Sequence, residues 1–201
     1  MAINQPPVQE KTANSLGLFP QTWILWFDTL RSNINSLFTR VDTLEHRSGW
    51  AFYDDSEYTS SSPLNANNES VLMTIDEQGS SNLTGYLPTD TVFYANDKIT
   101  PENVGDTYAL RLDFKAKGSS PADKFDVYID IGGSNPIIFD QSVEINKGSG
   151  VEQRYNLSIV IFSLNTFVAN GGAIYFDTSQ SGDNIDFYDF GLLITRVSTA
   201  V

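Results

Sequence analysis

The chain has 201 residues, of which 40% are hydrophobic, 12% are aromatic and only 18% are charged. Its formal net charge of −13 comes from 12 basic and 25 acidic residues, and such a surface repels phosphates, which argues against a nucleic-acid-binding protein. The absence of cysteine excludes disulfide bonds, thiol catalysis and zinc sites with cysteine ligands.

Residues 1–19 are predicted to be an extended docking arm. Pro6 and Pro7 favour polyproline geometry, and most residues around them are polar. Such a segment buries little surface by itself, so it is either a frayed terminus or a strap that orders on a partner. It lacks the basic start and apolar run of a signal peptide. No stretch of the chain has about 18 consecutive apolar residues, so we expect no membrane insertion.

Residues 20–48 are predicted to form one helix. Pro20 suits its first turn, and Gly49 suits its end. Apolar residues recur at steps of four and three over three heptads, with Phe27, Ile34 and Val41 at the a positions and Trp23, Leu30, Leu37 and Leu44 at the d positions.

This spacing is typical of a short parallel coiled coil. We therefore expect an interface between copies, formed by Phe27, Leu30, Ile34, Leu37, Val41 and Leu44. The heptads alone do not distinguish a dimer from a trimer. The alternative is a helix that packs on its own sheet, although such a helix usually carries a wider apolar stripe.

The first turn of this helix is apolar on all sides. Residues 23–27 are Trp-Ile-Leu-Trp-Phe, and one seam cannot bury five such side chains. The excess predicts a second contact, with another protein or with neighbouring arms. Because aromatic residues are common anchors of interfaces, we expect Trp23 and Trp26, together with Pro6 and Pro7 of the arm, to contact a partner.

From residue 49 to residue 201 the apolar period changes to two. Inward positions are predicted at Tyr108, Leu110, Leu112, Phe114 and Ala116, and again at Phe125, Val127, Ile129 and Ile131. These alternations indicate half-buried antiparallel strands. Further strands are predicted at 50–53, 70–75, 91–95, 137–145, 152–163, 173–177 and 185–197. Eight or nine strands with no helix between them predict an antiparallel β-sandwich of the jelly-roll type.

Two of these strands are apolar on both faces. They are LSIVIFSL at 157–164 and FGLLITRV at 190–197. One face can line the core of the sandwich, and the other should meet a neighbouring subunit. By analogy with jelly rolls mounted on coiled coils, we expect a compact trimeric β-domain.

No pattern in the sequence points to catalysis, a cofactor or a metal, and we expect none. The single histidine, His46, lies where a helix end favours positive charge. Acidic residues are numerous, but a glycosidase needs two of them facing one cleft. The loop at 181–186 does not follow the calcium-binding pattern. A sugar-stacking surface stays open as an alternative, with Trp50, Phe52, Tyr53, Tyr58, Tyr86 and Tyr128 as its aromatic candidates.

A polar arm, a tryptophan-rich heptad helix and the opening segment SGWAFYDDSEYTSSSP of the β-domain follow one another. This order resembles accessory virion proteins of tailed bacteriophages, namely head fibres, capsid decoration or cement proteins and short tail fibres. The resemblance implies that residues 1–27 dock on the particle, 27–45 trimerise and 50–201 project.

The expected function is therefore that of a non-enzymatic structural homotrimer of the virion, assembled in the bacterial cytoplasm, that decorates or stabilises the particle beside capsid or tail proteins. The low charge density and the short coil favour a compact decoration protein over a long fibre. One alternative is a tail-fibre protein that binds a receptor or a host-surface glycan. Another is a polysaccharide depolymerase.

Overall fold

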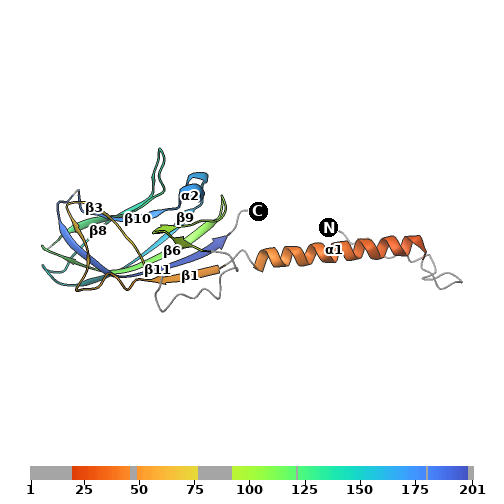
Figure 1. The fold of residues 1–201 in the computed structure, drawn as a ribbon, viewed down its shortest axis with the longest axis horizontal. Coiled ribbons are helices and arrows are strands. Elements are labelled where there is room, and N and C mark those ends of the chain that lie inside the picture. The colour runs from red at the N-terminus through yellow and green to blue at the C-terminus, as the bar shows by residue number, and fades with distance from the viewer. Residues whose placement is uncertain (1–19, 46–48, 77–91, 121, 180, 199–201) are drawn as a thin grey trace. The chain divides into compact units, whose positions relative to one another are not determined.

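The computed structural model describes residues 20–45, 49–76, 92–120, 122–179 and 181–198. The chain divides into two units, one up to residue 46 and the other from residue 47 onward. The first contains the helix α1, and the second contains the β-strands and the short helix α2 (Figure 1). None of the helices in the described ranges is both long and apolar enough to cross a membrane.

The helix α1 runs from Gln21 to Glu45 and begins one residue after Pro20. The carbonyl oxygen of Pro20 accepts hydrogen bonds from the backbone N–H groups of Trp23 (3.0 Å) and Ile24 (3.2 Å). Proline suits this position because its missing N–H would have no partner at a helix start in any case. Arg31 and Asp28, three residues apart, form an exposed ion pair of 3.3 Å, which adds only a few tenths of a kcal/mol.

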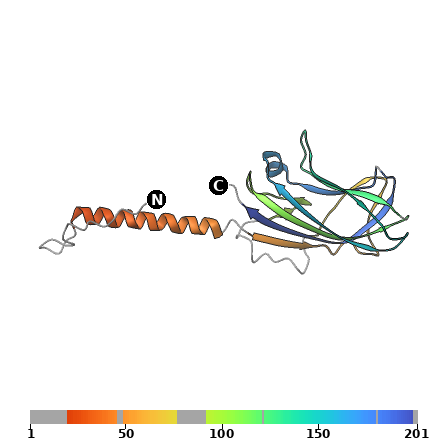
Figure 2. The same ribbon diagram turned by 180° about the vertical axis from the view of Figure 1, so that it is seen from behind.

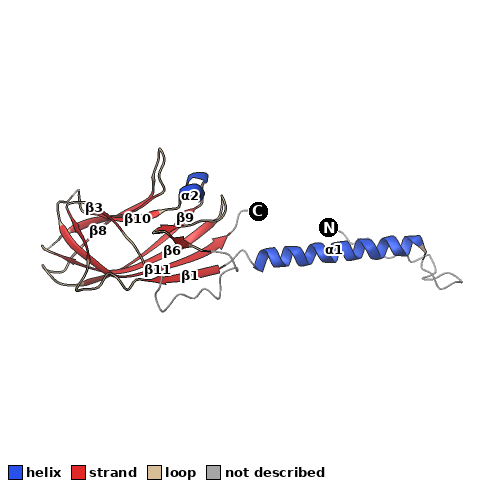
Figure 3. Ribbon diagram, in the orientation of Figure 1, coloured by secondary structure: helices blue, strands red, loops and turns tan. Residues whose placement is uncertain are grey.

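Two antiparallel sheets face each other and make up the second unit (Figure 2; Figure 3). The first, here called the β6 sheet, has the order β1 (Gly49–Asp54), β11 (Asn184–Ser198), β6 (Thr107–Gly118) and β9 (Gln153–Phe162), with β2 (Leu64–Asn67) also on β11. The second, the β7 sheet, has the order β3 (Ser70–Leu72), β10 (Ala173–Asp177), β7 (Lys124–Asp130) and β8 (Ile137–Glu144). A small hairpin of β4 (Tyr94–Ala95) and β5 (Lys98–Ile99) forms a separate two-stranded sheet, and Ile99 bridges it to Gly172, the residue before β10. This is the jelly-roll-like sandwich that the sequence predicts.

The core lies between the two sheets, and the predicted alternation of inward residues is confirmed. All nine inward positions predicted on β6, β7 and the residue after β7 are buried. Aromatic rings meet at the centre, where the ring of Phe114 lies 4.9 Å from Phe176 and 5.2 Å from Tyr155 between centroids. Burying one such side chain stabilises a fold by about 1.5–3 kcal/mol.

Three elements were not predicted: β2, β5 and the helix α2 (Asn165–Asn170). The helix is a single turn held by one buried residue, Phe167, and it ends at Gly171, whose φ is 71°. The next residue, Gly172, must be small because a Cβ there would lie 2.7 Å from the Phe167 ring. The predicted strand 70–75 ends at residue 72, and the predicted strand 91–95 contributes only β4 within the described residues.

A buried polar cluster fastens β11 to the loop before β6. The guanidinium of Arg196, 3% exposed, bonds to Glu102 and lies 3.8 Å from the fully buried Asp106. The Tyr108 hydroxyl donates to Asp106 (3.3 Å), and burial raises the pKa of Tyr108 to about 12. The guanidinium also lies over the ring of Phe93, 5.6 Å from its centroid. Buried charges of this kind are tolerated because they are paired.

Replacing Phe114 with alanine should lower the free energy of unfolding by about 3–5 kcal/mol, because it leaves a cavity among several aromatic rings. Urea denaturation followed by tryptophan fluorescence measures this change. The control is Val151→Ala, at an exposed loop position, which should change the stability by less than about 0.5 kcal/mol. Equal stabilities of the two variants would contradict the central place of Phe114.

Candidate assembly surfaces

The predicted seam of α1 is exposed to solvent in the single chain. Ile34 is 42% exposed and Leu37 is 54% exposed, while Leu30 is half-buried. Phe27 is 43% exposed. Val41 and Leu44 belong to α1, but their side chains lie outside the described residues. Solvent exposure of large apolar side chains in a regular stripe is unfavourable, so the seam is a surface that a partner would stabilise.

An aromatic cluster lies at the start of the helix. The ring centroids of Trp26 and Phe27 are 5.1 Å apart, and those of Trp23 and Trp26 are 6.0 Å apart, both pairs edge to face. Ile24 and Leu25 in the same turns are at least half exposed. The surplus of apolar surface predicted here is therefore present. The other two predicted docking residues, Pro6 and Pro7, lie outside the described residues, and docking itself stays a prediction.

One half of the outer face of the β6 sheet is apolar. Backbone register places Val160, Ala109, Thr195 and Trp50 in one row across β9, β6, β11 and β1, and places Leu193 beside Phe52 in the next row. The apolar residues of this apolar half are Trp50, Phe52, Ala109, Val160, Phe162 and Leu193, and the same two rows also hold Thr195, Arg111 and Ser158. Both Val160 and Phe162 are 65% exposed, so within the described part of the β-domain the β9 side of the apolar half is open to solvent.

The other half of the same face is charged, and its charges are paired with one another. Lys115 bonds to Glu152 (3.0 Å) and Asp189 (3.1 Å), and Lys117 bonds to Asp186 (3.3 Å). Its hydrogen bonds to Glu152 and Asp189 raise the pKa of Lys115. A hydrogen bond from the Tyr188 hydroxyl lowers the pKa of Glu152 most, and a hydrogen bond from Lys115 lowers it further. The charges of this half are paired within the chain, whereas Val160 and Phe162 leave the β9 side of the apolar half exposed to solvent.

A groove continues the apolar surface around the edge of the sandwich. It has a volume of about 440 Å³ and is lined by Ile138, Val160, Ile161, Phe162 and Leu164. Here β9 ends the order of one sheet and β8 ends the order of the other. The apolar surface of the β-domain thus has two parts, a sheet face and a sheet edge, which meet at β9.

The two strands predicted to be apolar on both faces behave differently. Along residues 157–164 burial alternates strictly, so that the apolar side chains of Val160, Phe162 and Leu164 point outward into solvent. Along 190–197 the outward residues Leu193 and Thr195 are half-buried. Trp50 was predicted as a candidate for a sugar-stacking surface, and its row with Val160 was missed because no sequence signal shows that register.

Comparisons with known proteins give fold likeness only. No family model matches the chain, and no curated protein matches it. Solved structures that are similar include Eiger TNF from S. frugiperda, with 8% identity over 77% of this chain and 96% of that chain (TM-score 0.43). Another is the globular domain of zebrafish complement 1qA, with 8% identity over 76% of this chain and 99% of that chain (TM-score 0.43). A third is the PRD1 vertex protein P5, with 13% identity over 75% of this chain and 73% of that chain (TM-score 0.42). Likeness at this level identifies neither a family nor a function.

Leu37→Asp should dissociate an oligomer formed through the α1 seam, because each copy would have to bury a carboxylate. The matched control is Thr39→Asp, which adds the same charge at an exposed position outside the seam. Sedimentation velocity should show a smaller species for the first variant and an unchanged mass for the second. An unchanged mass for Leu37→Asp would show that the seam is not part of an interface between copies.

Val160→Asp should weaken contacts between β-domains, because it places a charge in the apolar half of the outer face. Arg154→Gln is the control, since it makes the same change in net charge at an exposed position nearer the start of the same strand. The expected outcome is a loss of at least tenfold in self-association, measured by dilution in mass photometry, with no change for the control. Identical dilution curves would show that the apolar half takes no part in assembly.

Proposed function

We propose that this protein is a non-enzymatic structural component of a tailed-phage virion, a homotrimer that decorates or stabilises the particle. The observation that carries the proposal is the exposure of large apolar side chains on two surfaces of one chain, Ile34 and Leu37 in the α1 seam and Val160 and Phe162 in the apolar half of the β6 sheet. Only residues 46–48 connect α1 to β1. Copies joined through their helices therefore bring their β-domains together at high effective concentration.

A second copy is the partner that suits both surfaces. The seam has the spacing of a parallel coiled coil, which pairs each helix with its own kind in the same direction. A parallel arrangement brings the Gly49 ends of all β1 strands to the same level. The apolar half of the outer face includes Trp50, the first residue after that end, and we propose that copies joined by the coil also meet through it.

The face and edge parts of the apolar surface favour a ring over a two-fold dimer. A two-fold contact uses the same patch on both subunits, whereas a ring joins two different patches of each subunit. A contact between the sheet face around Phe52 and the edge groove around Leu164 buries both parts in every copy. Three copies make the smallest such ring, and a three-fold axis is also compatible with a coiled coil.

Attachment to a virion is supported by the order of segments and by the aromatic cluster of α1. The resemblance of arm, helix and β-domain to phage accessory proteins assigns docking to the N-terminal part. Trp23 and Trp26 lie together in the first turns, away from the part of the seam that runs from Leu30 to Leu44. We therefore assign them the docking role, although Trp23 is also the first d position of the heptad pattern.

Deleting residues 1–22 should leave the oligomer intact and abolish attachment to particles, because it removes the proposed arm and keeps the seam. Co-sedimentation with virions that lack this protein measures attachment, and sedimentation velocity measures the mass. A variant with both Trp23→Ala and Trp26→Ala in the full-length chain should also weaken attachment, without shortening α1. If the deletion variant occupies particles fully, the docking assignment is wrong.

A further inference from the structure

We propose that the outer face of the β7 sheet binds an uncharged saccharide, with the paired rings of Tyr128 and Tyr175 as its platform. This face lies on the opposite side of the core from the apolar half of the β6 sheet (Figure 1). The proposed binding is therefore separate from the proposed assembly, and either can fail without the other.

The two tyrosines form an aromatic pair in one row of the outer face, beside the partly exposed Leu72 of β3 and with carboxylates in the neighbouring rows. Tyr128 of β7 and Tyr175 of β10 are direct cross-strand partners, with ring centroids 5.1 Å apart and planes 13° apart. Both are half-exposed, whereas their strand neighbours Val127, Ile129, Ile174 and Phe176 are buried in the core. Tyrosine offers a sugar both an apolar ring surface for its C–H groups and a hydroxyl for a hydrogen bond.

Tyr128 is held in place by a hydrogen bond across the sheet. Its hydroxyl lies 2.7 Å from the hydroxyl of Ser70 on β3. Because the strand order is β3-β10-β7, the side chain crosses β10 to reach Ser70. Burial raises the pKa of Tyr128, and the charges of Asp177 and Asp130 raise it further, so the hydroxyl stays protonated at neutral pH. A ring already held this way loses little rotamer freedom on binding.

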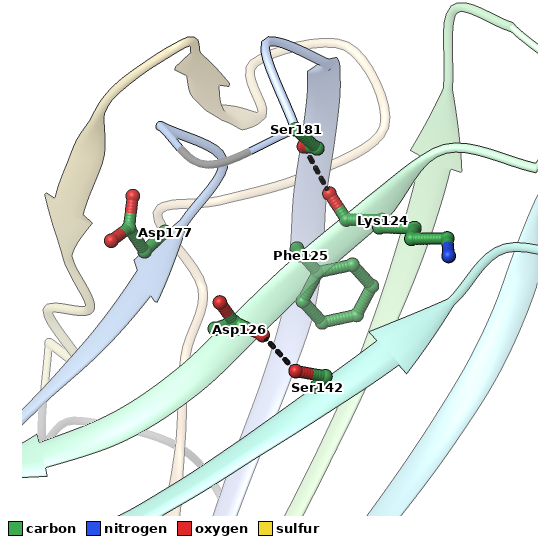
Figure 4. Close-up of a pocket in the computed structure, with 6 residues that line it drawn as sticks. All are labelled: Lys124, Phe125, Asp126, Ser142, Asp177 and Ser181. Carbon is green, nitrogen blue, oxygen red and sulfur yellow. Dashed lines mark hydrogen bonds between the residues drawn. The ribbon is translucent and has the colours of Figure 1, made fainter.

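Hydrogen-bond acceptors lie on one side of the pair. Asp126 and Asp177, the next outward residues on the two strands, oppose each other in the register. They line a hollow of about 210 Å³ together with Lys124, Phe125, Ser142 and Ser181 (Figure 4). Asp126 accepts a hydrogen bond from the Ser142 hydroxyl, and Asp177 accepts one from the backbone N–H of Ser179 (2.8 Å). A carboxylate has about four acceptor positions, so both can also accept from the hydroxyls of a ligand.

A second hollow lies on the other side of the pair. It has a volume of about 480 Å³, and Tyr175, Asp130, Gly132, Asn170 and Lys98 are among the residues that line it. One carboxylate oxygen of Asp130 accepts from the backbone N–H of Gly132 (2.6 Å). Lys98 donates to the backbone oxygen of Asn170 (3.1 Å). The tyrosine pair therefore has one hollow on each side. The two hollows together suit a chain of sugars better than a single small molecule.

The charge of the face selects against anionic ligands. Asp126, Asp130, Asp140 and Asp177 form no ion pair with any residue in the described ranges. The nearby Lys124 is paired with Glu144 at 2.9 Å. Sulfated, phosphorylated or sialylated glycans would be repelled. Within the described residues no group of three or more acidic or histidine side chains is placed to hold a metal ion, which leaves the carboxylates available as acceptors for sugar hydroxyls.

Affinity electrophoresis of the full-length protein in gels that contain dextran, mannan, galactan or a β-glucan tests the proposal. At least one of these neutral polysaccharides should retard the protein. Tyr175→Ala should weaken that retardation about tenfold, the loss expected for one aromatic contact. The double variant Asp126→Asn, Asp177→Asn should weaken it as well. Asp113→Asn is the control, because it makes the same change on the outer face of the β6 sheet and should leave binding unchanged.

Several outcomes would overturn the proposal. These are no retardation by any neutral polysaccharide, equal losses in Tyr175→Ala and Asp113→Asn, or release of reducing ends, which would make the face a hydrolytic site. Retardation by chitosan alone, abolished by salt, would assign the face to basic partners. If the unfolding temperature of Tyr175→Ala is well below that of the wild-type protein, the double variant Asp126→Asn, Asp177→Asn decides whether this face binds the saccharide. Particle attachment should be the same for all these variants.

Discussion

A two-layer sandwich can cover only one face of each of its sheets, and the other features of this protein follow from that constraint. β6 and β7 obey it simply, because each has one apolar face, and the two faces meet around Phe114. β9 does not, since it carries Leu157, Ile159 and Ile161 inward and leaves Val160 and Phe162 in solvent. The α1 seam likewise leaves Ile34 and Leu37 exposed to solvent in the single chain. What the fold cannot cover marks where a partner is needed.

Prediction from sequence succeeded where a local pattern decides the structure. Period-two alternation is local, so the inward residues of β6 and β7 follow from it directly, and the bounds of β10 at 173–177 match the prediction. Elements without local periodicity were missed. Strand β2 exists because it pairs with Asn184–Phe187 of β11, and α2 exists because Phe167 finds a buried site. Both depend on contacts with residues far away in the sequence.

The outer faces could not be predicted because they depend on register between distant strands. Trp50 meets Thr195, and Ala109 meets Val160, only after β1, β11, β6 and β9 are aligned. An irregularity between Tyr188 and Gly191 shifts that alignment partway along β11. The same holds on the β7 sheet, where Tyr128 was an aromatic candidate in the sequence but its partner Tyr175 was not.

The two outer faces of the sandwich are suited to different partners, and their chemistry shows why they need not compete. The apolar half of the β6 sheet offers a copy of the chain a mostly apolar surface, in which Arg111 is already paired with Asp113 (2.9 Å). The β7 sheet instead offers rigid aromatic rings among acceptors, which would be costly to bury against an apolar surface because the carboxylates would lose water without gaining partners. In the proposed assembly through the β6 sheet, the outer face of the β7 sheet is not part of the contact and stays available in every copy. If each binds a saccharide weakly, several copies on one particle bind a glycan-coated surface far more tightly than a single copy does.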